Sequence, residues 1–182
     1  MILPDWMIVA WASNGGITPF EMNNINPASI DLRVGNLWRD YHNKNAVFSA
    51  NQVMLYPRTA FTDTFNLLAK VTKVPRMMTA VLAMTMESIS ISNGIAGMVK
   101  LKSSCIREGL GYPIADWIDP GYSGKLTLML TAHSKFRLVS GMRIVQLVLE
   151  EMEECDRPYN FTGHYMNQEV PTLSWRNNGR TR

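Results

Sequence analysis

Short runs of apolar and β-branched residues, separated by turn sequences, dominate the chain after Gly16. Runs of this kind form strands, because branched and aromatic side chains pack well on a pleated sheet. The predicted strands are Ser29–Leu37, Gln52–Tyr56, Thr79–Ile91, Gly97–Leu101, Gly124–Ala132, Phe136–Val139 and Arg143–Glu150. Asn93-Gly94, Asp119-Pro120-Gly121 and Ser140-Gly141 supply turn chemistry between them. This pattern predicts a mainly β fold, a distorted β-barrel or jelly roll, and not alternating βαβ units.

One helix is expected, at the N-terminus. The segment Asp5–Ser13 places apolar residues at Ile8, Val9 and Trp11, with Asp5 as the N-cap. Glycines then follow directly at Asn14-Gly15-Gly16, and a glycine is the residue that most often ends a helix. We therefore predict a short opening helix.

Length and composition favour one domain that associates with copies of itself. The 182 residues, 46% of them apolar, suffice for one buried core and are few for two domains. Charged residues make up 18%, below the usual share of about a quarter, which indicates an apolar interface besides the core. We predict a single domain over 1–182, in which 158–182 form a polar and aromatic tail whose ordering would depend on a ligand or a neighbouring subunit.

Several function classes find no support in the sequence. The net charge of +3 is scattered, whereas a protein that tracks nucleic acid needs a denser basic stripe. Cys105 and Cys155 stand without a CxxC or Cys/His cluster, so neither a zinc site nor a disulfide framework is indicated, and reduced thiols are expected. No apolar run reaches the roughly 20 residues that span a bilayer, and no secretory leader is visible. We expect a cytoplasmic protein with no membrane and no nucleic-acid partner.

Four stretches, taken together, carry a family resemblance. They are residues 26–35 (NPASIDLRVG), 102–110 (KSSCIREGL), 118–124 (IDPGYSG) and 140–147 (SGMRIVQL). In order and spacing they resemble the blocks NPASIDLRLG, RSSxxRxGL, IDPGWSG and PGMRIxQL of the deoxycytidine triphosphate deaminase and dUTPase superfamily. Any one block alone is a weak signal, because short motifs recur by chance. The resemblance implies a homotrimeric, dUTPase-like fold, with active sites between subunits, that handles pyrimidine deoxynucleoside triphosphates.

The second block is expected to bind phosphate. The hydroxyls of Ser103 and Ser104 can donate hydrogen bonds to phosphate oxygens, and Lys102 replaces the bidentate arginine of the family by a point charge. Arg107 would offset triphosphate charge or orient the base, as its equivalent does in the deaminases that this chain resembles. The alternative is that the serines merely end a strand and that Arg107 forms an ordinary exposed ion pair.

The third block is expected to carry the chemistry. Asp119 lies where the dUTPases of the family place the carboxylate that activates a water or orients the sugar, and a carboxylate beside a triphosphate can act as a general base. Tyr122 would stack under the deoxyribose and exclude a 2′-hydroxyl. The alternative is a turn with a packed aromatic ring, and both can hold at once. Trp117, like Tyr112, would stack on a base or fill the barrel mouth.

The tail resembles that of the deaminases through Tyr159, Tyr165 and Gln168, which we expect to contact the nucleotide. His164 stands roughly where deaminases place a lysine that reaches the phosphates. The tail also lacks the glycine-rich arginine motif that closes over the nucleotide in typical dUTPases.

One position departs from the deaminase pattern. The catalytic glutamate of the deaminases follows Gly124 by five positions, and Met129 stands there in this chain. A thioether can neither accept nor donate the protons that deamination requires. Strand alternation places Met129 on one face with Lys125, Thr127 and Thr131, where no carboxylate occurs, and Asp116 is the only obvious substitute. The hairpin 111–117 is also one residue shorter than in the deaminases, so a base preference does not carry over.

These observations rank three functions. The first is a pyrophosphatase that converts dUTP to dUMP and pyrophosphate with a water activated by Asp119. Mg²⁺ would be the cofactor, bound through the triphosphate and not by protein ligands. The second is dCTP deamination to dUTP and ammonia. The third is a non-catalytic relative that binds a nucleotide or a protein.

Overall fold

The computed structural model describes residues 1–42, 46–57, 77–112 and 116–178. Its strands are β1 (Ile17–Thr18), β2 (Ile25–Asn26), β3 (Ser29–Asp40), β4 (Val47–Ser49), β5 (Gln52–Leu55), β6 (Met77–Met78), β7 (Ala80–Ser90), β8 (Ile95–Leu101), β9 (Leu110–Gly111), β10 (Trp117–Ile118), β11 (Ser123–Ala132), β12 (Phe136–Val139) and β13 (Arg143–Glu151). Its α-helices are α1 (Asp5–Trp11), α3 (Ser103–Arg107) and α4 (Tyr159–Thr162). The mainly β fold predicted from the sequence is confirmed.

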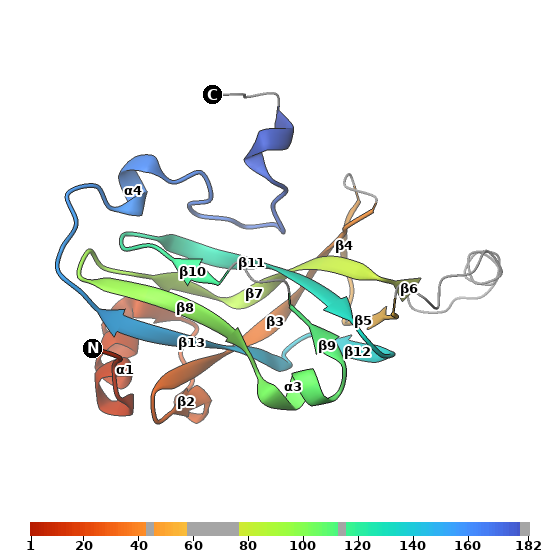
Figure 1. The fold of residues 1–182 in the computed structure, drawn as a ribbon, viewed down its shortest axis with the longest axis horizontal. Coiled ribbons are helices and arrows are strands. Elements are labelled where there is room, and N and C mark those ends of the chain that lie inside the picture. Colours follow the sequence, from red (N-terminus) through yellow and green to blue (C-terminus); the bar gives the residue numbers. More distant parts are fainter. Residues whose placement is uncertain (43–45, 58–76, 113–115, 179–182) are drawn as a thin grey trace.

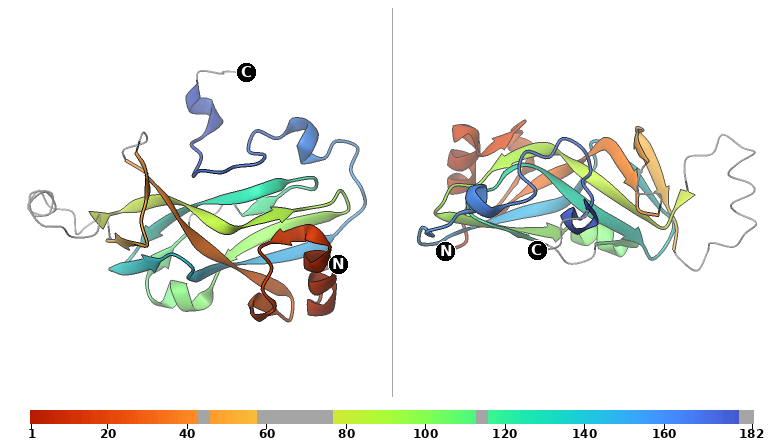
Figure 2. Two further views of the ribbon diagram at one scale, coloured as in Figure 1. Left: turned by 180° about the vertical axis from the view of Figure 1, so that it is seen from behind. Right: turned by 90° about the horizontal axis from the view of Figure 1, so that it is seen from above.

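The strands form one large curled sheet and one small sheet (Figure 1). The large sheet has ten strands, with the order β10-β8-β13-β3-β7-β11-β9, and β1, β2 and β4 attached beside this path. Strand β3 is shared by both halves, because its first residues pair with β13 and its later residues pair with β7. The sheet therefore bends along β3 and curls around one apolar interior as a half-barrel with β10 and β9 at its two ends, while β12, β5 and β6 form the small sheet at one end (Figure 2).

Strand β11 shows the alternation that the sequence predicts. Leu126, Leu128 and Leu130 are buried in the core, while Lys125, Thr127, Met129 and Thr131 are only half-buried on the opposite face. Successive side chains of a strand point to opposite faces, so this single strand contributes both to the core and to an outer surface.

The opening helix is shorter at its end than predicted. It spans Asp5–Trp11 and continues as a π-helical turn, Ala12–Gly16, in which Gly15 has a φ of +87°. Pro4 precedes the helix, so the expectation that Asp5 caps it was wrong by one residue: the Asp5 carboxylate instead accepts a hydrogen bond from the Trp6 amide at 2.8 Å. No helix within the described ranges is long and apolar enough to cross a membrane.

The predicted strands are all present, with ends that differ by up to three residues. Strands of two or three residues were missed, namely β1, β2, β4, β6, β9 and β10. Elements this short are defined by their partners, as β10 is by β8, and their own sequences carry too little periodicity to reveal them.

Two buried carboxylates lie on strands of the large sheet, and both are paired. Glu87 on β7 is fully buried, and it accepts hydrogen bonds from the Arg33 backbone amide at 2.8 Å and from Arg33 Nε at 2.7 Å. Asp31 on β3 accepts from Lys102 Nζ at 2.5 Å and from Asn26 Nδ2 at 2.9 Å. A buried charge is costly unless it is paired, so these contacts fix β3 against β7 and against the segment before α3.

A buried hydroxyl secures an irregularity in β11. The pairing of β11 with β7 shifts register between Lys125 and Thr127, which is a β-bulge. Within the bulge the Leu126 amide donates to the Thr85 hydroxyl at 2.9 Å, and this hydroxyl donates in turn to the Glu87 carbonyl at 2.7 Å. The bulge therefore has a satisfied backbone, and it sets the direction of Leu126 and Thr127.

We predict that Thr85→Val, which keeps the side-chain shape and removes the hydroxyl, lowers the free energy of unfolding by about 1–3 kcal/mol. The reason is that the Leu126 amide loses its buried partner. Urea denaturation measures the change. The exposed Thr18→Val is the matched control and should stay within about 0.5 kcal/mol of the parent protein; equal effects of the two variants would contradict this account.

Candidate active site

The segment expected to bind phosphate is a short helix and not a strand end. Strand β8 ends at Leu101, and α3 follows over Ser103–Arg107 with Ser103, Ser104 and Arg107 exposed. Cys105, on the inner side of α3, is buried, and burial raises the pKa of its thiol. The helix presents two hydroxyls and a guanidinium to the outside.

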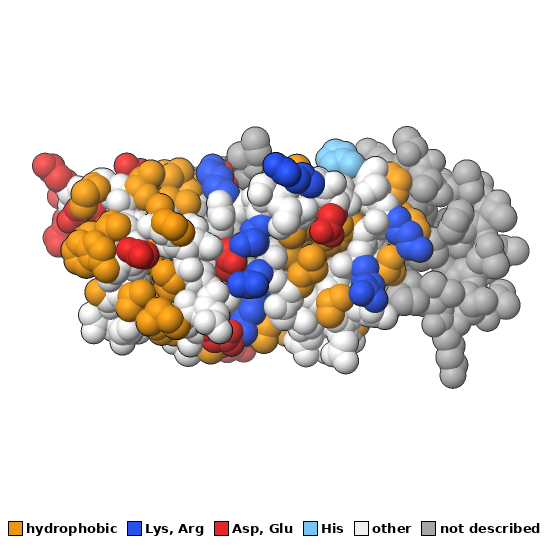
Figure 3. Space-filling model, turned by 90° about the horizontal axis from the view of Figure 1, so that it is seen from below, with side chains coloured by type: hydrophobic (Ala, Val, Ile, Leu, Met, Phe, Trp, Pro, Cys, Tyr) orange, Lys and Arg blue, Asp and Glu red, His pale blue; other side chains and the backbone are white. Residues whose placement is uncertain are grey.

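Lys102 is held in place at the start of this helix. Its backbone amide donates to the Ile144 carbonyl at 2.9 Å, and its ammonium donates to buried Asp31. An ammonium has three N–H donors, so this ion pair leaves capacity for a second anion. Arg143 lies near the same carboxylate, at 3.8 Å, and half of its side chain is exposed. Lys and Arg side chains gather across the middle of the lower face of the molecule, the side on which α3 lies (Figures 1 and 3).

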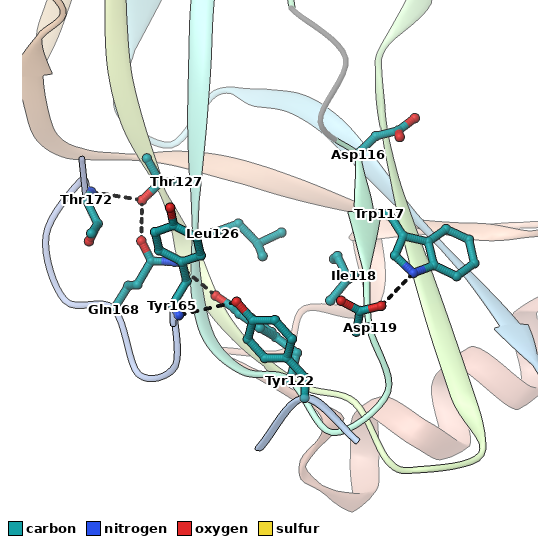
Figure 4. Close-up of a pocket in the computed structure, with 11 residues that line it drawn as sticks. Asp116, Trp117, Ile118, Asp119, Tyr122, Leu126, Thr127, Tyr165, Gln168 and Thr172 are labelled. Atoms are coloured by element: carbon teal, nitrogen blue, oxygen red, sulfur yellow. Dashed lines mark hydrogen bonds between the residues drawn. The ribbon is translucent and has the colours of Figure 1, made fainter. Parts of the chain in front are cut away.

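A cavity of about 580 Å³ opens on the other side of the sheet, beneath the tail (Figure 4). It is lined by strands β10 and β11, the turn between them and the tail, through Asp116, Trp117, Ile118, Asp119, Tyr122, Leu126, Thr127, Tyr159, Tyr165, Gln168 and Thr172. A concave site with an apolar floor and a few converging polar groups is the usual form of a small-molecule site.

The structure separates the predicted site residues into two groups. Six of them line this cavity, namely Trp117, Asp119, Tyr122, Tyr159, Tyr165 and Gln168. Lys102, Ser103, Ser104 and Arg107 do not, because α3 lies below the sheet while α4 and the tail lie above it (Figure 1). One chain alone thus does not bring the two groups together.

Asp119 stands at the mouth of the cavity. It precedes the turn Pro120-Gly121, in which Gly121 has a φ of +82° and donates its amide to the Ile91 carbonyl at 3.0 Å. A positive φ favours glycine, so the predicted turn is present and aims the side chains on either side of it. The Trp117 indole N–H donates to Asp119 Oδ1 at 2.9 Å.

Tyr122 forms part of the cavity floor. Its ring is buried, its hydroxyl donates to the Lys125 carbonyl at 2.7 Å, and the Tyr159 ring lies 5.7 Å away. Burial raises the pKa of Tyr122 to about 12, although a hydrogen bond from Gln168 opposes the shift. The phenol therefore stays neutral near physiological pH and serves as a fixed surface and not as an acid or base. This position is compatible with both roles considered for Tyr122, stacking under a deoxyribose and packing as an aromatic ring beside the turn.

The tail lies against β11 of its own chain. Thr127 Oγ1 donates to Gln168 Oε1 at 2.7 Å and accepts from the Thr172 amide at 3.1 Å. The Asn167 amide donates to the Ser123 carbonyl at 2.9 Å. That the tail orders on a ligand or a neighbouring subunit stays a prediction; the structure describes residues 158–178 with these contacts to their own chain, and 179–182 lie outside the described residues.

The charge of the cavity is negative. Asp116 and Asp119 line it, and none of its described lining residues is a lysine or an arginine. Asp116 accepts a hydrogen bond from Lys100, which holds the pKa of the carboxyl below its usual value. An ion pair with Lys100 favours the ionised form of Asp116, and its role as a substitute for the deaminase glutamate stays a prediction.

Met129 lies outside this cavity, further along the outer face of β11. Together with Thr131 and His133 it lines a neighbouring cavity of about 650 Å³. Residues 113–115 of the preceding hairpin lie outside the described residues, and Tyr112 of the same hairpin packs half-buried against the core.

His164 does not line the cavity. Its ring stacks on Trp175 at 4.4 Å in an exposed part of the tail. The phosphate-binding role expected for His164 stays a prediction, since the described chain places no phosphate-binding residue beside it.

Sequence reasoning missed Ile118 and Thr172 as cavity residues. Ile118 lines the cavity because β10 pairs with the edge of β8. Thr172 lines it because the tail crosses β11, where the Thr172 amide donates to the Thr127 hydroxyl at 3.1 Å. Both placements arise from contacts between distant segments, which no local pattern signals.

Comparisons with known proteins identify the family of the chain. The family model described as dCTP deaminase-like matches residues 2–152. The chain is 34% identical over 181 residues to a dUMP-forming dCTP deaminase of Methanospirillum hungatei, covering 96% of this chain and 95% of the relative. It is 33% identical over 168 residues to a dCTP deaminase of Pyrococcus horikoshii, with 91% of each chain covered.

A solved structure shares the fold. The 2′-deoxycytidine 5′-triphosphate deaminase of Agrobacterium tumefaciens superposes with a TM-score of 0.63 at 17% identity and covers 82% of this chain. The present chain spans 48% of the length of that protein chain.

We predict that Gly124→Ala displaces the tail. An added Cβ at Gly124, whose φ is +131°, would lie 2.9 Å from the Asn167 amide nitrogen and 3.0 Å from its Cα. Hydrogen exchange of the backbone amides of residues 166–172 should become faster in this variant.

Gly141→Ala is the matched control. It introduces the same residue at a φ of +88°, but nothing lies within 4 Å of the added Cβ. The account fails if both variants speed exchange in the tail equally, because the effect would then come from general destabilisation.

Proposed function

The chain belongs to the dCTP deaminase-like family, and on that premise we propose that it hydrolyses pyrimidine deoxynucleoside triphosphates, with dUTP converted to dUMP and pyrophosphate. The observation that carries this proposal is the composition of the site: Asp119 stands at the cavity mouth, while the strand position of the deaminase glutamate holds Met129. Relatives named as dUMP-forming support dUMP as the product.

The proposed step uses Asp119 as a general base. A water beside Asp119 attacks the α-phosphorus, and its proton passes to the carboxylate. The new bond joins the water oxygen to the α-phosphorus, and the bond from that phosphorus to the oxygen bridging to the β-phosphate breaks. Pyrophosphate leaves, and the nucleoside monophosphate retains the water oxygen.

Tyr122 would select the sugar. Its buried ring is fixed from below by the bond to the Lys125 carbonyl, so it cannot move aside for a larger ligand. A deoxyribose stacked on this ring would leave no room for a 2′-hydroxyl. Thr127 and Gln168 also line the cavity, and their polar side-chain groups would lie nearest to a bound base.

The triphosphate requires cations that the cavity lacks. A nucleotide with several negative charges would meet Asp116 and Asp119 and no cation among the described lining residues. The complementary charge and hydroxyls lie on the opposite face. They belong to Lys102, just before α3, and to the exposed α3 residues Ser103, Ser104 and Arg107. We therefore propose that α3 of a second copy completes each cavity, which a homotrimer with three equivalent interfaces allows.

Mg²⁺ would enter with the triphosphate. In the described part of the chain no three His, Cys, Asp or Glu side chains gather as a set of metal ligands. Bound through the triphosphate, Mg²⁺ would neutralise charge on the phosphates.

Deamination of dCTP is the alternative reaction. Relatives named dCTP deaminase support it, whereas the methionine at position 129 and the pairing of Asp116 with Lys100 argue against it. Ammonia release from dCTP would establish deamination. A protein that releases neither ammonia nor pyrophosphate would be the non-catalytic binder.

We predict that Asp119→Ala lowers pyrophosphate release from dUTP by at least about a hundredfold, since the general base is removed. Release is measured by chromatography of the nucleotide products in Mg²⁺ buffer. The exposed Asp156→Ala is the control and should retain the parent rate. An Asp119→Ala protein as active as this control would overturn the assignment.

Mixing two defective proteins tests the shared site. Asp119→Ala removes the proposed general base of the cavity and leaves α3 intact. Arg107→Ala removes a cation of α3 and leaves the cavity intact. Refolding the two together should restore roughly a quarter of the parent activity, because some cavities with Asp119 then face an intact α3. A mixture no more active than either variant alone would show that each chain builds its own complete site.

A further inference from the structure

The indole of Trp117 is exposed at the edge of the large sheet. Strand β10 contains only Trp117 and Ile118, paired to β8 at the edge of the sheet. Ile118 points inward and is buried, packed closely against Gly97. Because side chains alternate along a strand, Trp117 and Asp119 both point outward, and they lie on the same side.

The exposed indole has a defined polar contact. Trp117 is 55% exposed, and its N–H donates to Asp119 Oδ1 at 2.9 Å (Figure 4). Such an N–H usually finds a partner when it can, and here the partner is the carboxylate at the cavity mouth. A hydrogen bond to a charged acceptor is about twice as strong as a neutral one.

Trp117 and Asp119 together form a ridge between two hollows. Both residues line the 580 Å³ cavity, and both also line a smaller cavity of about 360 Å³ on their other side, with Arg157 and Cys155 on its far wall. A nucleotide in the larger cavity would displace water from one side of the ridge. The hydrogen bond between the two side chains then lies in a less polar environment, where it becomes stronger.

From this geometry we propose that Trp117 is a positioning residue for Asp119. The inference rests on the proposed role of Asp119 as general base. The indole N–H occupies Oδ1, so Oδ2 is the oxygen that accepts the proton from water. The terminal torsion of an aspartate is broad, and a donor fixed by a strand narrows it to one orientation. Trp117 therefore acts through Asp119 and not as a stacking surface for the base.

The kinetic test is Trp117→Phe, which keeps an aromatic ring and removes the N–H. We expect kcat to fall about tenfold with KM changed less than about twofold, because the base is misoriented while the cavity wall is kept. Trp6→Phe, at an exposed tryptophan on α1, is the matched control and should leave both constants unchanged. A raised KM with unchanged kcat, or no effect at all, would overturn the proposal.

A second measurement does not depend on activity. The chain has five tryptophans, and the indole N–H resonance that is missing from Trp117→Phe identifies Trp117 in the NMR spectrum. In Asp119→Ala this resonance should move further than the other four, since it loses its acceptor. A resonance that stays in place contradicts the hydrogen bond. If the protein proves inactive but the resonance moves, the proposed function has failed and the Trp117–Asp119 contact has not.

Discussion

Strand β11 must present two different faces, and this constraint organises both the barrel and the site. Its leucines, Leu126, Leu128 and Leu130, are buried in the core and cannot face water without a large loss of hydrophobic stabilisation. The opposite face is then left to Thr127 and Met129, and the tail lies against it at Thr127. The bulge at Leu126, whose amide is held by the buried Thr85 hydroxyl, shifts the register of β11 against β7 where β11 lines the cavity.

Charge imposes a second constraint. The cavity carries Asp116 and Asp119, while the exposed cations before and within α3 lie on the other side of the sheet. Neither set of charged side chains can move easily to the other face. Lys102 is bound to the buried Asp31, and Asp119 follows strand β10, which is paired with β8. Under the proposed function, a single chain thus carries the cavity on one face and the phosphate-binding residues on the other. Association of identical chains is the simplest way in which a polyanionic nucleotide could meet both halves.

The sequence patterns predicted the long elements and the family, but they did not predict the contacts between segments that are distant in the sequence. The alternation of β11 and the turn at Gly121 follow from residue types alone, because pleating and positive φ act locally. Helix α3 was not predicted, since five residues hold too little periodicity to identify a helix. Contacts of the tail with Thr127, and of Lys102 with Asp31, bring together residues 41 and 71 positions apart, and no local signal encodes them. The roles of the site residues rest on the family resemblance as much as on the geometry.

The central claim is that a water at Asp119 attacks phosphorus and not the pyrimidine ring. Turnover of dUTP and dCTP in water enriched in heavy oxygen, with mass spectrometry of the products, tests it most directly. The account predicts that the heavy oxygen enters the phosphate of the nucleoside monophosphate and that the base carries none. Heavy oxygen on the carbon that bore the amino group of dCTP would contradict it, because the water would then have attacked the ring despite Met129.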